Sequence, residues 1–328
     1  MAQLNPRLLK ETAAQQLEQA AYNPKKLVLI HTGVFIGLNL AVNLLNLVLN
    51  NQIGTTGGLS GMGLRSILQT VQTLLGYFSA FFSPFWAAGF LFAAISIFRG
   101  TEVGPKSFLR GFTRFGRILS FTLWQVLLLV SSCIVLMYVT CFLYMLTPFS
   151  KEATDLINQA IAENSHALTQ GALDLSLFPM EEITAAMMPM MIFYGIAALA
   201  LTTFISYQLR LGTFLLIEGI NRGAFGAILV SAGLMRGHKW QMFKLDLSFW
   251  WYHGLELLFT IVLYLDLLLP MLGIPLPFDQ TIMYFICLAA YGILELILHY
   301  WKKADVEVVY AAAYDAIYQE ALPKQPPV

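Results

Sequence analysis

The stretch LVLIHTGVFIGLNLAVNLLNLVL, residues 27–49, contains no Asp, Glu, Lys or Arg, and Lys25 and Lys26 stand directly before it. A helix of about 20 apolar residues crosses the hydrocarbon core of a bilayer, so this stretch is long enough to span one. Five further apolar stretches follow at 74–98, 118–146, 187–209, 247–270 and 280–300. We therefore expect an all-α, polytopic membrane bundle of about six transmembrane helices, accompanied by amphipathic helices at the interface.

The basic residues predict the orientation of this bundle. Seventeen of the nineteen Lys and Arg residues fall in the N-terminal segment, in alternate loops and in the C-terminal tail. The positive-inside rule then places both termini in the cytoplasm. Only 12% of the residues are charged, against about 25% in soluble domains, and 58% are hydrophobic. The formal net charge of zero gives no indication of nucleic acid as a partner.

Three regions follow from this pattern. Residues 1–26 predict a cytoplasmic amphipathic helix, which Asn5 can cap and Pro6 can begin. Residues 27–300 form the six-span membrane domain, and residues 301–328 form a cytoplasmic amphipathic tail. The sizeable external segment is 147–186, which holds six acidic residues and a single lysine.

The chain contains methionines and cysteines that could bind soft metals, but their positions favour a packing role. Methionines cluster where the fourth span begins, a pattern that suits copper(I) but also suits flexible packing, and neither Cys nor His joins them. The three cysteines all lie inside predicted spans, which argues against disulfides and zinc sites. We expect no metal and no cofactor. The clustered methionines are Met180, Met187, Met188, Met190 and Met191.

The second cytoplasmic loop carries a basic stripe. Lys106, Arg110, Arg114 and Arg117 are spaced 4, 4 and 3 apart, and three phenylalanines follow a different face. This spacing predicts one interfacial helix over 106–117 that contacts anionic lipid headgroups. Ordinary positive-inside anchoring, without lipid selectivity, is the alternative interpretation. The bilayer, anionic lipids and another membrane protein are the partners that we consider.

Residues 234–249 read LMRGHKWQMFKLDLSF. This segment resembles the hallmark of the bacterial integral-membrane family called domain of unknown function 975, in which a helix ends in a Met-Arg-Gly turn before the next span. FLRGFTRFG at 108–116 and the Tyr-rich segment 310–322 resemble further parts of the same family. The resemblance covers most of the chain. It implies a multi-pass protein of the bacterial plasma membrane whose activity is unknown.

The hallmark also predicts a cytoplasmic elbow. Gly237 follows an apolar helix and suits a left-handed C-cap, and a basic residue before it suits the negative helix end. Asp246 and Ser248 stand where the fifth span begins, which suits the positive end of that helix. The elbow residues are Arg236, Gly237, His238, Lys239, Asp246 and Ser248.

Ionisable residues within the apolar stretches are the best chemical lead, because burying them in a bilayer is costly. His253 and Glu256 share one face of the fifth span, and Glu295 and His299 share one face of the sixth. We expect the two glutamates to face each other. A proton relay, a cation site, a divalent-metal site and plain interhelical hydrogen bonding all remain open. His31 is expected at the interface and Asp266, near the outer end, in contact with water.

No nucleophile elbow, phosphate-binding loop or zinc-protease motif occurs, so the sequence does not favour an enzyme. Two functions stay open. The first, which we slightly favour from the sequence, is a non-catalytic membrane scaffold or a stress or assembly accessory protein. The alternative is a transporter or permease for a small solute, an ion or a proton, using His253, Glu256, Glu295 and His299.

Overall fold

A computed structural model of the chain describes residues 5–55, 62–163, 180–220 and 223–322, and these residues form helices and turns without any strand. The all-α expectation is confirmed. In chain order the helical elements are α1 Pro6–Glu18, α2 Pro24–Thr55, α3 Met62–Phe98, the 3₁₀ segment η2 Pro105–Leu109, α4 Arg110–Thr113, α5 Phe115–Met145, α6 Pro148–Glu163, α8 Met180–Leu209, α9 Gly212–Ile217, α10 Ala224–Leu234, α11 Lys239–Leu247, α12 Trp250–Leu263, α13 Leu265–Met271, α14 Gln280–Leu298, the π-helical segment η4 His299–Lys303 and α15 Ala304–Ala321.

The chain divides into two compact units, residues 1–122 with 210–328 and residues 123–209. By length and composition, five helical stretches of the described chain could cross a membrane, and the bent pair α12–α13 would make a sixth. The five lie in α2, α3, α5, α8–α9 and α14–α15.

The fifth apolar stretch differs from the expected single helix over 247–270. α12 ends at Leu263 and α13 begins at Leu265, and the two helices meet at an angle of 70°. The break contains neither Gly nor Pro, so periodicity alone could not reveal it. It places Asp266 in the first turn of a new helix, where a carboxylate is favourable.

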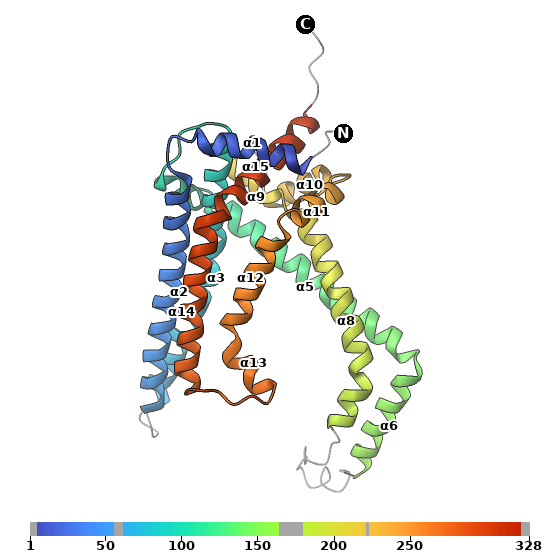
Figure 1. Cartoon of the computed structure of the whole chain (residues 1–328). Helices are drawn as coiled ribbons and strands as arrows, with labels where there is room; N and C mark the ends of the chain where they lie inside the picture. Colours follow the sequence, from blue (N-terminus) through green and yellow to red (C-terminus); the bar gives the residue numbers. More distant parts are fainter. Residues whose placement is uncertain (1–4, 56–61, 164–179, 221–222, 323–328) are drawn as a thin grey trace. The chain divides into compact units, whose positions relative to one another are not determined.

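In the first unit, α2 packs against α3 and α14, and α12 packs against α14 (Figure 1). At the end of this bundle α1 lies across α15. The expected cap of α1 is confirmed, because the side chain of Asn5 accepts a hydrogen bond from the backbone N–H of Arg7 at 3.0 Å. Ala13 of α1 is fully buried.

The C-terminal helix α15 is a central element. The sequence suggested an amphipathic tail, yet ten of its side chains are buried, including Tyr310 and Tyr314. Arg99, at the end of α3, forms ion pairs with Asp315 of α15 at 2.6 Å and with Glu218. Glu218 also accepts a hydrogen bond from the hydroxyl of Tyr314 at 2.6 Å. Charge pairing together with burial therefore fixes α15 against α3 and α9.

The predicted single helix over 106–117 is wrong. Residues 105–109 form the 3₁₀ segment η2, α4 is only four residues long, and the helix breaks at Arg114 before α5 begins. The basic residues Lys106, Arg110, Arg114 and Arg117 therefore do not share one helical stripe, and their contact with lipid headgroups stays a prediction.

Close packing against α3 explains this irregular path. The backbones approach so closely that a Cβ at Gly89 would overlap the carbonyl of Phe108, and one at Gly111 would overlap the carbonyl of Phe85. Phe108 is fully buried, and the ring of Phe112 lies 5.7 Å from that of Phe85. The aromatic residues of this loop thus pack on α3, where a regular amphipathic helix would have turned them to the bilayer.

In the second unit, α6 packs against α8. α6 lies in the segment 147–186 that we expect to be external, and residues 164–179 of that segment lie outside the described residues. The methionines 187–191 are part of α8, and Sδ of Met190 lies 4.0 Å from Sγ of Cys141. This contact fits the packing role of a flexible thioether.

Candidate functional site

α12 supplies the first half of the predicted polar cluster. His253 and Glu256 stand three residues apart and therefore project from the same side of the helix. Nδ1 of His253 lies 3.1 Å from Oε2 of Glu256, and both side chains are partly exposed within the described structure. The two residues form a hydrogen-bonded pair within one helical turn.

The junction of α14 and η4 supplies the second half. Glu295 lies in the last turns of α14, and His299 begins the π-helical segment. Nδ1 of His299 lies 3.7 Å from Oε1 of Glu295. π-Helical turns inside α-helices are rare and frequently mark functional sites.

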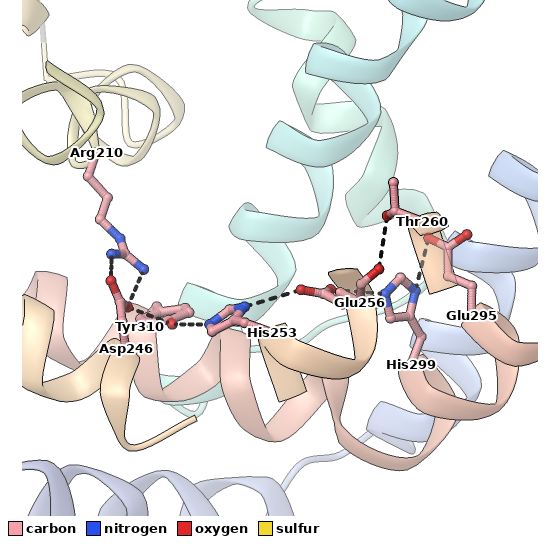
Figure 2. Close-up of polar contacts among 8 residues, drawn as sticks. All are labelled: Arg210, Asp246, His253, Glu256, Thr260, Glu295, His299 and Tyr310. Atoms are coloured by element: carbon pink, nitrogen blue, oxygen red, sulfur yellow. Dashed lines mark hydrogen bonds and ion pairs between the residues drawn. The ribbon is translucent and has the colours of Figure 1, made fainter. Parts of the chain in front are cut away.

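His299 joins the two halves (Figure 2). Its Nε2 lies 3.4 Å from Oε1 of Glu256, and its Nδ1 lies 3.1 Å from the hydroxyl of Thr32 on α2. We expected Glu256 and Glu295 to face each other directly, whereas the buried imidazole of His299 contacts both carboxylates. The structure therefore brings all four predicted residues together, with a histidine between the acids.

The cluster continues beyond His253 to three residues that sequence reasoning did not connect with it. Nε2 of His253 lies 3.1 Å from the hydroxyl of Tyr310 on α15, and that hydroxyl donates to Asp246 of α11 at 2.8 Å. Arg210 holds the same carboxylate with two hydrogen bonds, at 2.5 and 2.8 Å. Figure 2 shows one row of contacts from Arg210 through Tyr310 and His253 to His299.

The directions of these hydrogen bonds do not fix the position of one proton. The Asp246 carboxylate only accepts, so Tyr310 gives it the phenolic proton. The phenolic oxygen then accepts from Nε2 of His253, which must carry a hydrogen. Nδ1 of the same ring faces an oxygen of Glu256, and one of these two atoms must hold a proton. The pair is either an imidazolium with a carboxylate or a neutral imidazole with a carboxylic acid.

Tyr310, Arg210 and Thr32 lacked a local sequence signal. Tyr310 stands in a Tyr-rich segment, but its partner His253 is 57 residues away along the chain. Arg210 was one of several basic residues near the fourth span, and Thr32 is a hydroxyl within an apolar stretch. Their role depends on how distant segments pack, such as α2 against α14 and α15 against η4, which helical periodicity does not predict.

The elbow residues occupy the region around α11. Gly237 has a φ of +90°, so the predicted left-handed position is confirmed, and Lys239 begins α11. The expected position of Asp246 and Ser248 at the start of the fifth span is wrong, because Asp246 lies in the last turn of α11, Ser248 is the C-cap of α11, and α12 begins at Trp250. Asp246 instead pairs with Arg210. Arg236 is exposed. Nε2 of His238 lies 3.4 Å from the carboxylate of Glu320. The backbone carbonyl of Ser248 accepts a hydrogen bond from Lys10 at 2.9 Å. Burial, and then the charge of Lys302, lower the pKa of Lys10.

His31 is buried, although we expected it at the interface. Its ring stacks on Trp86 with 5.5 Å between the ring centroids and lies 4.6 Å from the ring of Phe90. Among the described residues, neither ring nitrogen has a hydrogen-bond partner. His31 is therefore a packing residue of the aromatic core and stands apart from the row of contacts.

The described part of the chain contains no group of three or more His, Cys, Asp or Glu side chains arranged to hold a metal ion. The metal interpretation of the His and Glu cluster therefore has no support in its geometry. Proton exchange and hydrogen bonding remain the chemistry that these side chains offer.

The apolar helices and the internal row of ionisable side chains define a polytopic helical membrane protein with a polar network in its first unit. Residues 7–322 match the model of the family described as "Protein of unknown function (DUF975)", and the chain belongs to this family. The resemblance seen in the sequence is thus confirmed. Neither the curated proteins nor the solved structures include a significant match to the chain.

Replacing Asp246 with Ala should destabilise the protein. The change leaves the Arg210 guanidinium and the Tyr310 hydroxyl without their shared partner, which typically costs roughly 1–3 kcal/mol. Thermal unfolding of the purified protein in detergent measures this loss. Asp305→Ala is the matched control, because its ion pair with Lys302 is more exposed and its removal should cost no more than about 0.5 kcal/mol. Equal unfolding temperatures for the two variants would contradict a structural role for the Asp246 contacts.

Proposed function

We propose that this protein moves protons through its first unit along the row from His253 to Glu295. The observation that carries the proposal is the alternation of imidazole and carboxylate groups: His253, Glu256, His299 and Glu295 contact one another in turn, at 3.1, 3.4 and 3.7 Å. Intramembrane ionisable residues in such series are typical of proton pathways.

Each central group can receive a proton from one neighbour and release one to the next. Glu256 presents Oε2 to His253 and Oε1 to His299. His299 presents Nε2 to Glu256 and Nδ1 to Glu295. When Nδ1 of His253 passes its proton to Oε2, Glu256 becomes a carboxylic acid. Rotation of this carboxyl group brings the protonated oxygen to Nε2 of His299. As Nε2 takes the proton, the imidazole releases the proton on Nδ1 to Glu295.

Two features support movement through the row over a purely static network. Oε2 of Glu295 is buried and has no hydrogen-bond partner among the described residues, so this carboxyl group can accept a proton. The proton between His253 and Glu256 has two chemically reasonable positions, as the hydrogen-bond directions showed. Fixed interhelical hydrogen bonds need neither property.

A scaffold or assembly role is the second candidate, and it was the preferred one from the sequence. Its support is the arrangement of α1 across α15 and the burial of α15, which tie the chain ends to the bundle. On this interpretation the polar row only holds α2, α11, α12, α14 and α15 together. The geometry favours proton movement, because binding the helices together does not require alternating acids and bases.

The same proposal includes an orientation, with both termini on the cytoplasmic side of a bacterial plasma membrane. Segments that the charge pattern assigns to the cytoplasm contact one another: Lys10 binds Ser248, and Arg99 binds Asp315. We expect Lys244→Cys to react with a membrane-impermeant reagent only after cells are permeabilised, and Ala160→Cys to react in intact cells. Both variants need a background without the three native cysteines. The opposite labelling pattern would contradict the orientation.

Proton flux into proteoliposomes tests the function directly. An imposed potassium diffusion potential should drive protons into vesicles that contain the wild-type protein, as reported by an internal pH-sensitive dye. Glu256→Gln should abolish the flux, because an amide cannot pass a proton between His253 and His299. Glu102→Gln, an exposed change outside the row, should leave it unaffected.

If vesicles with folded wild-type protein show no more proton flux than empty liposomes, the proposal is wrong and the scaffold role remains. Size-exclusion chromatography and circular dichroism of each variant separate loss of the relay from loss of the fold.

A further inference from the structure

A second polar site lies far along the same helices from His299. A cleft of about 320 Å³ opens between α2, α13 and α14, and Asn46 and Asp266 are among its lining residues. Asn46 stands fourteen residues after Thr32, which contacts His299, so the two positions are roughly 20 Å apart along α2. The cleft is therefore distinct from the row of proton-exchanging groups.

Side chains from three helices converge on this cleft. Asn43, Asn46 and Asn50 of α2 are spaced 3 and 4 apart and so share one helical face. Tyr284 of α14 and Asp266 of α13 complete the polar lining. The bend between α12 and α13 turns Asp266 toward this site, since a continuous helix would have carried it along the course of α12.

Two acceptor groups of the lining have no hydrogen-bond donor among the described residues. Tyr284 donates to Oδ1 of Asn43 at 2.8 Å, and Gln72 donates to Oδ1 of Asn50 at 3.0 Å. Oδ1 of Asn46 is buried and has no partner among the described residues. Within the same residues, no hydrogen bond reaches the Asp266 carboxylate, although this residue is only 5% exposed. We had expected Asp266 to meet water.

An unpaired carboxylate and an unpaired amide oxygen call for a ligand that is positively charged and donates hydrogen bonds. Asp266 is almost entirely buried and lines the cleft, so a positive ligand there would compensate the lost hydration of its carboxylate. A cleft of this size, near the lower limit of small-molecule sites, far exceeds a bare ion. The aromatic rings of Tyr284 and Phe285 also line it, and aromatic faces attract organic cations.

We propose that this cleft binds the primary ammonium group of a small organic amine. The ammonium places its charge against Asp266 and donates N–H groups to Asp266 and to Oδ1 of Asn46. Its short alkyl part lies along Tyr284 and Phe285. The site needs no proton movement through Glu256, so it stands independently of the proposed function.

Ligand-induced thermal stabilisation of the full-length protein in detergent tests the site, with propylammonium chloride as the probe at neutral pH. Binding only to the folded state raises the unfolding temperature as the probe concentration rises. Propylammonium should stabilise the wild-type protein. Tetramethylammonium, which has the charge but no N–H, and sodium at equal concentration should not.

Asp266→Asn should abolish the propylammonium shift, whereas Asp279→Asn, a nearby change at the N-cap of α14, should retain it. Asn46→Leu removes the unpaired acceptor at similar size and should weaken binding about tenfold, the effect of losing one hydrogen bond worth about 1.4 kcal/mol. If Asp266→Asn does not fold, Asn46→Leu tests the site in its place. Equal shifts for the three cations, or an unchanged propylammonium shift in both Asp266→Asn and Asn46→Leu, would overturn the proposal.

Discussion

The first unit depends on one constraint: ionisable side chains placed among apolar helices must find partners inside the protein, because the bilayer offers none. His253, Glu256 and His299 meet this requirement by contacting one another. The contacts continue from His253 through Tyr310 and Asp246 to Arg210, in segments that we propose for the cytoplasmic side. Apart from the His253–Glu256 pair within α12, each contact joins two different elements, so the same bonds that satisfy the charges also hold α11, α12, η4 and α15 together. The helix arrangement and the chemistry of the row therefore have a common origin.

The row also links α15 and the π-helical turn that follows α14 to α12. α15 is buried mainly against α1 and α3, and from it Tyr310 reaches His253 of α12. His299 begins the π-helical turn and contacts Glu256, Glu295 and Thr32 from that position. The irregular turn thus coincides with the residue that links both carboxylates. A row with alternating acids and bases can pass protons, whereas stability alone would be served by apolar packing.

The sequence predicted the all-α class, the apolar stretches and the four central residues of the row, because hydropathy and helical spacing are local properties. It failed where the answer depended on contacts between distant segments. Lys106 to Arg117 formed an apparent stripe, but close approach of Gly111 to α3 imposed a 3₁₀ segment and a break. Asp266 stood at the end of an apparent continuous span, but the 70° bend buried it beside Asn46. Tyr310 and Arg210 had no signal that tied them to His253.

Proton movement along the row depends on a proton shared between His253 and Glu256. Nitrogen-15 magnetic resonance of histidine-labelled protein in lipid bilayers detects this proton, with His253→Asn used to assign the resonances. Glu256→Gln should move the Nδ1 resonance of His253, because the protonation of that nitrogen depends on the carboxylate. The resonances of His31, whose ring nitrogens have no partner among the described residues, should stay in place and serve as the internal control. An Nδ1 resonance of His253 that is identical in the wild-type protein and in Glu256→Gln would contradict the account.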